Sequence, residues 1–326
     1  MTIDVLCLRP EADFQRAGSL PPAALKIAYR APDDPDVPEI MKQARALVIP
    51  AVGPRLPPSL FERSSVKFVQ VTGAGLDRLD LPTLKRLGIS VSNVPGGSNS
   101  AVAEYVVTAA SVLLRRFAWA DAEIRAGRYR EFRARLVSDN LCGLDGLAVG
   151  IVGLGVIGLA VAEAFRQRGC QIFYHDPAPR DPQAAASLGA KSVSLDELWK
   201  ACHVITLHVP LLPATRGLIG QRQLAAMKAG VILINASRGG IVDEAALAHS
   251  LQSGHLGGAA VDVYFDEPPS PSNPLLCLDG EAAHRILFTP HIAGVTRQSA
   301  AFLFRAAWRN IERVLIENAP PVDRAL

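Results

Sequence analysis

The stretch Val149-Gly-Ile-Val-Gly-Leu-Gly-Val-Ile-Gly158 decides the fold. It places an apolar strand, residues 149–152, directly before three glycines spaced as Gly-X-Gly-X-X-Gly, and a helical segment, residues 159–167, directly after them. Glycine-rich turns are common, but this one has the strand before it and the helix after it that a dinucleotide-binding turn requires. The sequence therefore predicts a turn of that kind within a parallel sheet.

Each glycine of this turn has its own expected role. Gly153 permits the tight turn, Gly155 lets backbone N–H groups approach a pyrophosphate, and Gly158 lets the helix pack closely on the sheet. The N-terminus of the helix adds partial positive charge that favours phosphates. Asp176, at the end of the next strand, is placed to accept the ribose hydroxyls of NAD and to repel the extra phosphate of NADP. We therefore predict NAD as the cofactor, with nearby Arg180 complicating the preference over NADP.

Short apolar runs alternate with helical segments along most of the chain. In the second half the expected strands are residues 149–152, 171–175, 204–208, 231–235, 259–263 and 286–289, and the expected helices are residues 159–167, 195–200, 222–227 and 244–253. In the first third the expected strands are residues 46–50, 67–71 and 89–93, and the expected helices are residues 38–44 and 81–87. Strand alternating with helix indicates a parallel sheet covered on both faces. The fold class is therefore α/β, with two doubly wound parallel-sheet domains.

Three further segments set the domain boundaries. Residues 101–120 form one long helical run, with Glu104 near its start and basic residues near its end, as the helix dipole favours. The Arg-rich segment 125–135 follows; a solvated helix or arm is the simpler interpretation, and a phosphate-backbone patch is the alternative. A helix over residues 298–317 ends the chain, and we expect it to pack back on the first domain. The expected domains are residues 1–99 with 294–326, and residues 100–293.

Composition limits the class of protein. Of the residues, 49% are hydrophobic and the formal net charge is only +3, so neither disorder nor a nucleic-acid partner is expected. The five cysteines are scattered and never spaced as Cys-X-X-Cys, which argues against a disulfide framework and against a metal site. The N-terminus does not resemble a signal peptide, and the uncharged stretch 147–162 is shorter than a membrane span. We expect a cytoplasmic protein without a membrane or metal partner.

Three later strands each end in a polar motif. Arg238 follows the strand at 231–235, Glu267 follows the strand at 259–263, and His291 follows the last strand. The carboxyl ends of the strands form the edge at which ligands bind in open α/β sheets. One Arg, one Glu and one His at successive strand ends therefore form a coherent chemical set.

That set suits hydride transfer between NAD and a 2-keto or 2-hydroxy acid. The fixed fork of donors on an Arg can polarise the carbonyl and hold the carboxylate. A His is the natural proton donor to the developing alkoxide, and the base in the reverse direction. A Glu hydrogen-bonded to that His favours the imidazolium form and fixes its orientation.

Taken singly, each of these residues is more often structural than catalytic, so the prediction depends on their joint placement. Five other histidines do not share that placement and are interpreted as surface or strand-end residues: His175, His203, His249, His255 and His284. His208, in His208-Val-Pro210, is expected to line the cofactor cleft instead.

Five motifs, in their order and spacing, resemble those of the D-isomer-specific 2-hydroxyacid dehydrogenases. They are Leu207-His-Val-Pro-Leu211, Met227-Lys-Ala-Gly230, Asn235-Ala-Ser-Arg-Gly-Gly-Ile-Val-Asp243, Asp262-Val with Glu267-Pro268, and Thr289-Pro-His-Ile-Ala-Gly294. The resemblance extends from about residue 73 to the end of the chain. It implies a Rossmann NAD-binding domain and a flavodoxin-like substrate domain, with a cleft that closes about hinges near Asn99 and Val295.

The resemblance also implies roles for individual residues. Arg238, Glu267 and His291 would be catalytic, and the substrate carboxylate would be held by Gly73, Ala74 and Gly75 together with Arg238. Cofactor contacts are expected from Gly153, Gly155, Val156, Ile157, Gly158, Asp176, His208, Val209, Pro210, Ala236, Ser237, Arg238, Asp262, His291 and Gly294. A homodimer is implied as well, with the long helix and the following arm at its interface. One departure from the family pattern is the segment 280–285, which lengthens the gap between Glu267 and His291.

The substrate and two alternatives remain open. Glyoxylate, hydroxypyruvate, phosphohydroxypyruvate and bulkier keto acids all agree with the motifs; for a phosphorylated acid, Arg55 and Arg78 are the candidate cations. A dehydrogenase of formate or phosphite would use the same cofactor fold, although Leu76 stands where a cation would bind an inorganic anion. An NAD-sensing, corepressor-like binding protein would need an exposed apolar groove or long disordered tails.

Overall fold

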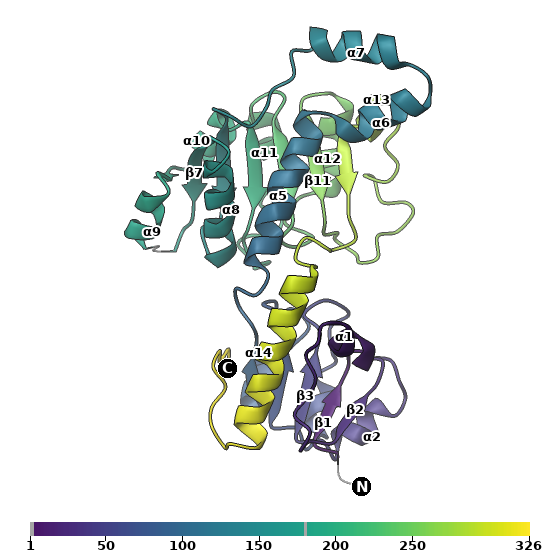
Figure 1. Cartoon of the computed structure of the whole chain (residues 1–326), viewed down its shortest axis with the longest axis vertical. Coiled ribbons are helices and arrows are strands. Elements are labelled where there is room, and N and C mark those ends of the chain that lie inside the picture. Colours follow the sequence, from purple (N-terminus) through teal and green to yellow (C-terminus); the bar gives the residue numbers. More distant parts are fainter. Residues whose placement is uncertain (1–2, 179–180) are drawn as a thin grey trace. The chain divides into compact units, whose positions relative to one another are not determined.

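The computed structural model describes residues 3–178 and 181–326 (Figure 1). The chain divides into two compact units: the first unit is Met1–Ser98 with Val295–Leu326, and the second unit is Asn99–Gly294. Within the described residues each unit contains one sheet, five-stranded in the first and seven-stranded in the second, and all strand pairs are parallel. The predicted fold class, α/β with two doubly wound parallel sheets, is confirmed.

The first unit has the strand order β2-β1-β3-β4-β5. Its strands are β1 (Val5–Cys7), β2 (Ile27–Tyr29), β3 (Ala46–Ile49), β4 (Phe68–Val71) and β5 (Ser90–Ser92). Its helices are α1 (Glu11–Arg16), α2 (Val37–Met41), α3 (Ser59–Glu62), α4 (Leu81–Arg86) and α14 (Arg297–Leu315). The sequence did not predict β1 and β2, because each has three residues and β2 is only half-buried at the sheet edge.

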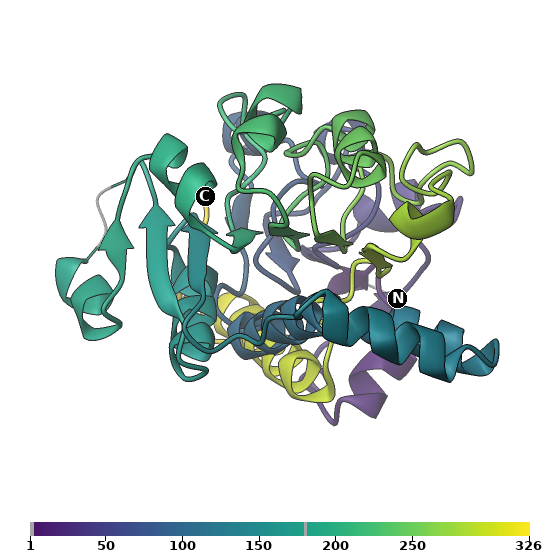
Figure 2. The same ribbon diagram turned by 90° about the horizontal axis from the view of Figure 1, so that it is seen from above.

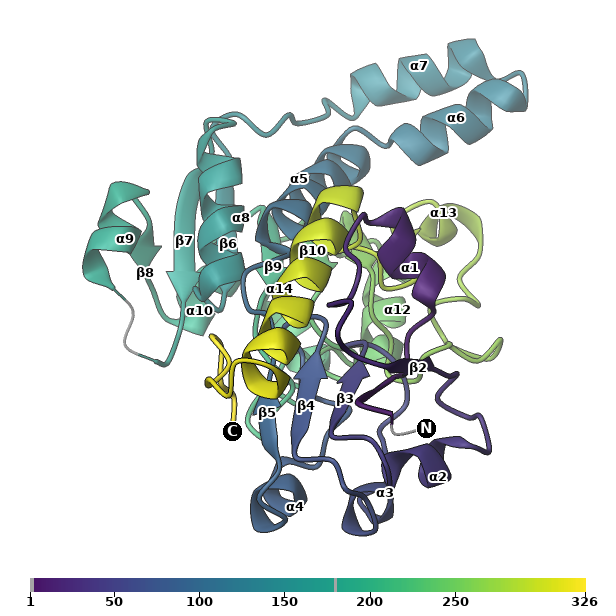
Figure 3. The same ribbon diagram turned by 60° about the horizontal axis from the view of Figure 1, so that its bottom comes forward.

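Alternate residues of these strands enter two separate hydrophobic clusters, one on each face of the sheet. Leu47 and Ile49 pack with side chains of α2, α3 and α4, whereas Ala46 and Val48 pack with α1 and α14. Figure 1 shows α14 in yellow along the strands of this unit, and Figure 3 shows the same face with β3, β4 and β5 beside it. A parallel sheet buried on both faces explains why its strands are apolar throughout.

The terminal helix α14 belongs to the first unit because its apolar stripe matches that sheet. Phe304, Trp308 and Ile311 are spaced for one helical face, and all three are buried against β1, β3 and β4. Burial of Phe304 or Ile311 contributes about 1.5–3 kcal/mol. The helix begins at a capping box, in which the Thr296 hydroxyl accepts from the amide of Ser299 at 3.1 Å.

The second unit has the strand order β12-β11-β10-β9-β6-β7-β8. Its strands are β6 (Ala148–Val152), β7 (Gln171–His175), β8 (Lys191–Ser192), β9 (Val204–Leu207), β10 (Ile232–Asn235), β11 (Gly258–Val261) and β12 (Ile286–Phe288). The short, exposed edge strand β8 was not predicted. From β6 the chain first adds β7 and β8 on one side of the sheet and then crosses to add β9, β10, β11 and β12 on the other side. The carboxyl ends of β6 and β9 therefore form the switch point at which such sheets bind ligands.

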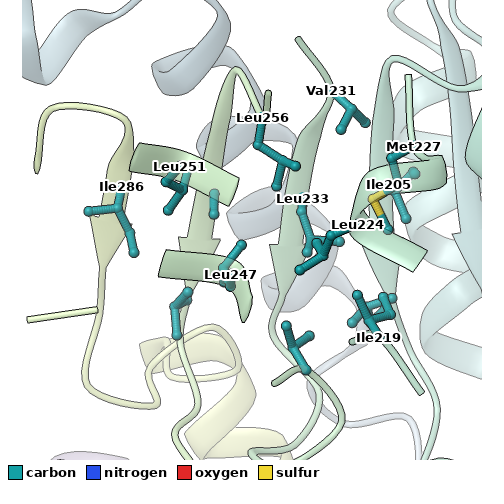
Figure 4. Close-up of a cluster of buried hydrophobic side chains, with 14 of the residues drawn as sticks. Ile205, Ile219, Leu224, Met227, Val231, Leu233, Leu247, Leu251, Leu256 and Ile286 are labelled. Atoms are coloured by element: carbon teal, nitrogen blue, oxygen red, sulfur yellow. The ribbon is translucent and has the colours of Figure 1, made fainter. Parts of the chain in front are cut away.

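Helices cover both faces of this second sheet, as Figure 2 shows. On one face lie α5 (Asn99–Leu114) and α8 (Val156–Arg166), and on the other lie α10 (Leu195–Ala201), α11 (Gln221–Ala226) and α12 (Glu244–Gln252). Figure 4 shows Leu224, Leu247 and Leu251 against strand residues such as Leu233. Helix α9 (Pro182–Ser187) directly precedes β8 in sequence.

The predicted single helix over residues 101–120 is wrong. The structure has two helices there, α5 and α6 (Phe117–Arg125), because Arg116 adopts a left-handed backbone conformation with φ of 51°. Tertiary contacts stabilise this break: the Arg116 guanidinium pairs with Asp139 and lies 5.6 Å from the centre of the Trp119 ring. Helix propensity alone favours a continuous helix, so nothing in the local sequence indicates the break.

The helices α6 and α7 (Tyr129–Ser138) form a hairpin that we call the arm; Figure 3 shows it extending from α5. Trp119 packs on Phe132 with ring centres 5.3 Å apart. Several arginines of the arm pair with carboxylates, as in Arg128 with Glu123 and Arg125 with Asp121. These ion pairs agree with the simpler interpretation of the Arg-rich segment.

The segment that departs from the family pattern forms α13 (Gly280–Ala283), which packs against the arm. Glu281 accepts from Arg135 of α7 at 2.8 Å. His284 stacks on Trp119, with ring centres 5.0 Å apart and planes inclined by 5°. The extra residues are therefore an ordered support for the arm.

Candidate active site

The glycine turn joins β6 to α8, and two of its glycines are required by the turn itself. Gly153 has φ of 93°, and a Cβ atom there would lie 2.5 Å from the carbonyl oxygen of His208. A Cβ atom on Gly158 would lie 2.1 Å from the carbonyl oxygen of Gly153. Real Cβ atoms do not approach so closely, so both positions need glycine for packing.

Gly155 differs from its two neighbours because nothing in the protein requires glycine there. Its φ is −74°, which any residue adopts, and a Cβ atom on it would meet no atom within 4 Å. The open space lies at the N-terminus of α8, which has 11 residues and orphan backbone N–H groups at its first turn. Space beside a helix N-terminus fits a ligand with phosphate groups that approaches the backbone closely.

Asp176 lies just beyond the carboxyl end of β7, beside the turn. Its Oδ2 atom accepts from the amide of Leu154 at 2.8 Å, and its Oδ1 atom accepts from the amide of Ala178 at 2.9 Å. The two contacts fix the carboxylate in orientation, as a group that accepts ribose hydroxyls must be. Arg180, which was expected to complicate the cofactor preference, lies outside the described residues.

The segment His208-Val-Pro210 follows β9 and lies against the glycine turn. A Cβ atom on Gly153 would come within 2.8 Å of Val209 as well as 2.5 Å of the His208 carbonyl. The His208 Nε2 atom is 2.9 Å from the hydroxyl of Thr206. Burial lowers the pKa of His208 to about 3, so this imidazole is neutral near pH 7.

Ala236, Ser237 and Arg238 follow β10 in a turn that Asn235 organises. Asn235 is 5% exposed, and its Oδ1 atom accepts from the Ser237 hydroxyl at 2.8 Å. Its Nδ2 atom donates to the carbonyl of Arg238 at 3.0 Å. The guanidinium of Arg238 donates to the Ser237 carbonyl at 2.7 Å. Sequence reasoning missed this role of Asn235, although an Asn at a strand end is a known turn-forming signal.

Asp262, after β11, holds the loop that carries His291. Asp262 is 1% exposed; its Oδ1 atom accepts from the Thr289 hydroxyl at 2.6 Å and from the Ile292 amide at 2.8 Å. Its Oδ2 atom accepts from the Ala293 amide at 2.9 Å, and its carbonyl accepts from the His291 amide at 2.8 Å. A carboxylate with this many donors rigidly fixes the chain around it. Its expected contact with the cofactor stays a prediction.

His291 and Glu267 form a hydrogen-bonded pair. The Nδ1 atom of His291 is 2.8 Å from Oε2 of Glu267, and the side chains are 25% and 32% exposed. The other carboxylate oxygen, Oε1, accepts from the amide of Tyr264 at 3.1 Å. His291 has φ of 55°, a left-handed conformation that is uncommon away from glycine and is typical of functional loops. With Nδ1 engaged by the carboxylate, Nε2 is the ring nitrogen that is left to exchange a proton with a ligand.

The Arg238 and Glu267 segments also lie together. A Cβ atom on Gly239 would be 1.7 Å from the carbonyl oxygen of Tyr264, so the two backbones touch directly after Arg238 and just before Glu267. The structure thus brings the motifs after β10, β11 and β12 to neighbouring places at one sheet edge. That edge is the carboxyl edge at which the glycine turn also lies.

In the first unit, Gly73, Ala74 and Gly75 follow the carboxyl end of β4. The Gly73 carbonyl accepts from the Val94 amide at 2.9 Å, and Asn93 donates through Nδ2 to the Ala74 carbonyl at 2.7 Å. These bonds occupy carbonyl groups of the loop and fix its backbone. Leu76, beyond the loop, packs on the core of this unit.

The two candidate cations for a phosphorylated substrate are already engaged. Arg78 is 2% exposed and donates to the carbonyls of Pro54 at 2.8 Å and Pro50 at 3.1 Å. Burial lowers the pKa of Arg78 below its usual value. Arg55 pairs with Asp80 at 3.2 Å. Arg78 therefore braces the loop after β3, and its contact with a phosphorylated substrate stays a prediction.

Comparison with known proteins identifies the family. The profile of the D-isomer specific 2-hydroxyacid dehydrogenase NAD-binding domain matches residues 107–293, more than half of the chain. The chain belongs to this family. The second unit is accordingly an NAD-binding domain, and the orientation of Asp176 and the open space at Gly155 fit that cofactor.

Its relatives carry different names within the D-2-hydroxyacid dehydrogenase family. A D-3-phosphoglycerate dehydrogenase of Archaeoglobus fulgidus is 37% identical over 72% of this chain and 42% of its own length. A glyoxylate reductase of Aeropyrum pernix is 33% identical over 80% of this chain and 77% of its own length. A D-lactate dehydrogenase of Treponema pallidum has a similar structure, with a TM-score of 0.79, 28% identity and 99% coverage of both chains. The chain spans less than half of the length of the first phosphoglycerate dehydrogenases that it matches.

Among the described residues, no group of three or more His, Cys, Asp or Glu side chains is arranged to hold a metal ion. No described helix is long and apolar enough to cross a membrane. The five cysteines are all free, with Cys7, Cys170 and Cys202 buried.

Proposed function

We propose that the protein transfers hydride between NAD(H) and a small 2-hydroxy acid of D configuration or its 2-keto form, with His291 as the proton donor and acceptor. The observation that carries this proposal is the contact of 2.8 Å between His291 Nδ1 and Glu267 Oε2 at the carboxyl edge of an NAD-binding sheet. Membership of the dehydrogenase family supports the reaction type. The alternatives of a formate- or phosphite-type dehydrogenase and an NAD-sensing binding protein have no specific observation in their favour.

The proton is assigned to the Nε2 atom of His291. Held at the glycine turn, the nicotinamide cofactor would supply the hydride for C2 of the keto acid. In the direction of reduction, His291 donates a proton to the oxygen on C2. In oxidation the same nitrogen accepts that proton. Glu267 engages Nδ1, so it sets the orientation of the ring and leaves Nε2 for the proton transfer.

We assign Arg238 to the binding of the substrate. Its guanidinium is oriented by a hydrogen bond to the Ser237 carbonyl, and its segment touches the one before Glu267 through Gly239. A planar cation suits both the carboxylate and the carbonyl oxygen of a 2-keto acid. The backbone N–H groups of Gly73, Ala74 and Gly75 in the first unit are assigned to the same carboxylate.

The cofactor is assigned to the glycine turn and the strand ends around it. Because Gly155 has no side chain, the pyrophosphate can approach the backbone N–H groups closely there, and Asp176 accepts hydrogen bonds from the ribose hydroxyls. The further contacts are assigned to Val156, Ile157, His208, Val209, Pro210, Ala236, Ser237, Asp262 and Gly294.

Two finer assignments complete the proposal. We assign a homodimer with the arm at its interface, supported by the exposed apolar side chains of Phe117, Ile124, Tyr129 and Val137 on α6 and α7. We also assign the protein to the cytoplasm, where unpaired cysteines such as the five found here are typical.

The test is NADH consumption with a panel of 2-keto acids that differ in size and charge: glyoxylate, pyruvate, hydroxypyruvate, phosphohydroxypyruvate and phenylpyruvate. At least one acid should be reduced, and His291→Ala should lower kcat by about 10²- to 10⁴-fold. The exposed His249 on α12 provides the matched control, and His249→Ala should keep wild-type turnover. Wild-type turnover in His291→Ala would refute the assignment. Tight NADH binding without reduction of any acid would favour the sensing alternative.

A further inference from the structure

We propose that Glu244 is a positioning residue for this reaction, because it fixes the loop that presents Glu267 to His291. The inference rests on the proposed function above, since it concerns the same His–Glu pair. Glu244 is the first residue of α12, and the loop follows β11. Sequence reasoning gave Glu244 no role beyond the start of a helix.

The Glu244 carboxylate holds the loop at two points. Its Oε1 atom accepts from the amide of Phe265 at 2.8 Å. Its Oε2 atom accepts from the side-chain Nδ2 of Asn273 at 2.6 Å. The two points lie on either side of Glu267 in the sequence. One carboxylate therefore fixes both ends of the segment that carries the partner of His291, through hydrogen bonds strengthened by its charge.

Asn273 is itself fixed in place. Asn273 is 9% exposed, and its Oδ1 atom accepts from the Leu275 amide at 2.9 Å. Its own amide donates to the Ser270 carbonyl at 2.9 Å, and its carbonyl accepts from the Leu276 amide at 3.0 Å. With Oδ1 engaged by the backbone, the orientation of the side-chain amide is set, and Nδ2 faces Glu244.

The hydrophobic core provides little support for this segment. Phe265, Asp266 and Glu267 are exposed, Phe265 by 63%. A hollow of about 510 Å³ borders the loop and is lined in part by Arg216, Asp243, Glu244, Phe265, Ser270 and Asn273. A segment without apolar packing depends on its hydrogen bonds for its position.

Adjacent amides connect Glu244 to the proposed chemistry. The amide of Phe265 donates to Glu244, and the preceding amide, of Tyr264, donates to Oε1 of Glu267 at 3.1 Å. The other oxygen of Glu267 contacts His291. Tyr264 is buried in the core, and Phe265 is the next residue, so the Glu244 contact fixes the chain where it leaves the core just before Glu267. A misplacement of about 1 Å at an active site can lower the rate by about 100-fold.

The test compares a variant that breaks the contact between Glu244 and Asn273 with a double variant in which the donor and the acceptor of that contact are exchanged. Glu244→Gln replaces one oxygen by an NH2 donor that faces the Asn273 donor, so one of the two contacts is lost. Adding Asn273→Asp offers an acceptor at that place and keeps the oxygen that accepts from Leu275. The double variant Glu244→Gln/Asn273→Asp therefore regains both contacts with the net charge unchanged. Glu163→Gln is the matched control, because Glu163 contacts Arg166 and Gln167 on its own helix.

Three quantities are measured for each variant: kcat with the fastest acid of the panel, the NADH dissociation constant, and hydrogen exchange at the amides of Tyr264 and Phe265. Glu244→Gln should lower kcat by about 10- to 100-fold with an unchanged dissociation constant, and both amides should exchange about 10-fold faster. The double variant should restore kcat and slow exchange. Glu163→Gln should resemble the wild type in all three.

Wild-type kcat and wild-type exchange in Glu244→Gln would overturn the inference, and so would losses that the double variant leaves unrepaired. His291→Ala separates this result from the proposed function. Wild-type turnover in His291→Ala refutes the proposed function. If His291→Ala loses turnover but Glu244→Gln keeps full turnover, only the positioning role is refuted. If no acid of the panel is reduced, unchanged amide exchange in Glu244→Gln still overturns the positioning role. Faster exchange that the double variant repairs supports it.

Discussion

The carboxylate of Asp262 accepts from the hydroxyl of Thr289 at 2.6 Å, and the same residue's carbonyl accepts from the amide of His291 at 2.8 Å. One buried residue at the end of β11 therefore fixes the loop at the end of β12. His291 has a left-handed backbone conformation, which persists only where the surrounding structure holds it. Asp262 provides that support.

Asp262→Asn should therefore destabilise the protein and misplace His291. The amide side chain replaces one acceptor oxygen by a donor, which faces donor groups such as the amide of Ala293. Leaving a buried donor unsatisfied costs about 1–3 kcal/mol. Urea unfolding measures the loss, with the exposed Asp266→Asn as control. An unchanged free energy of unfolding would show that Asp262 does not hold this loop.

Alanine substitutions should distinguish the roles of two glycines of the turn. Gly155→Ala should fold with wild-type stability and lose at least about 10-fold in NADH affinity, because its Cβ atom occupies the space assigned to the cofactor. Gly158→Ala should instead lower the thermal midpoint, because its Cβ atom would lie 2.1 Å from a carbonyl oxygen. Calorimetry and NADH titration test the pair. Wild-type affinity in Gly155→Ala would remove the assignment of that space to the cofactor.

His208 should make the protein less stable in mild acid. Burial lowers its pKa from 6.5 to about 3, so in the pH range between these values the unfolded chain binds a proton that the folded chain does not. Stability contributed by the neutral form is thus present above pH 6.5 and decreases as the pH falls, by up to about 2 kcal/mol near pH 5. His208→Asn should have a shallower dependence between pH 7 and pH 5, measured by urea unfolding. Equal slopes for the two proteins would contradict this.

The arm should control the oligomeric state. Ile124→Glu and Val137→Glu place charges on apolar side chains that are 49% and 67% exposed. In a dimer that buries the arm, these charges would be desolvated, so each variant should shift the protein toward the monomer in light-scattering measurements. Leu20→Glu changes a side chain of the first unit that is 65% exposed and should leave the mass unchanged. A dimer that persists in both arm variants would show that the interface does not involve the arm.

Apart from β8, the strands of the second sheet were predictable from sequence because they are largely apolar runs bounded by polar residues. The observed β7 agrees with the expected bounds, and β10 and β12 differ by one residue at one end. The carboxyl-end motifs with Arg238, Glu267 and His291 were predictable for a similar reason, since strand order places such motifs at one edge. Their roles in the reaction stay predictions.

Other features depend on contacts that are distant in the sequence. Neither the three residues of β1 nor the left-handed Arg116 carries a local signal, because the first depends on pairing with β2 and β3 and the second on Asp139 and Trp119. The same is true of Glu244, whose partner Asn273 lies 29 positions away. Positioning residues of this kind are found only when the fold brings their partners together.

The most direct test of the central claim is a double-mutant cycle of kcat/KM on Glu267 and His291. If Glu267 acts through the imidazole, Glu267→Gln should lower kcat/KM by about 10- to 100-fold in the wild-type background and should have no further effect in His291→Ala. Equal losses from Glu267→Gln in both backgrounds would contradict the account, because Glu267 would then act independently of His291.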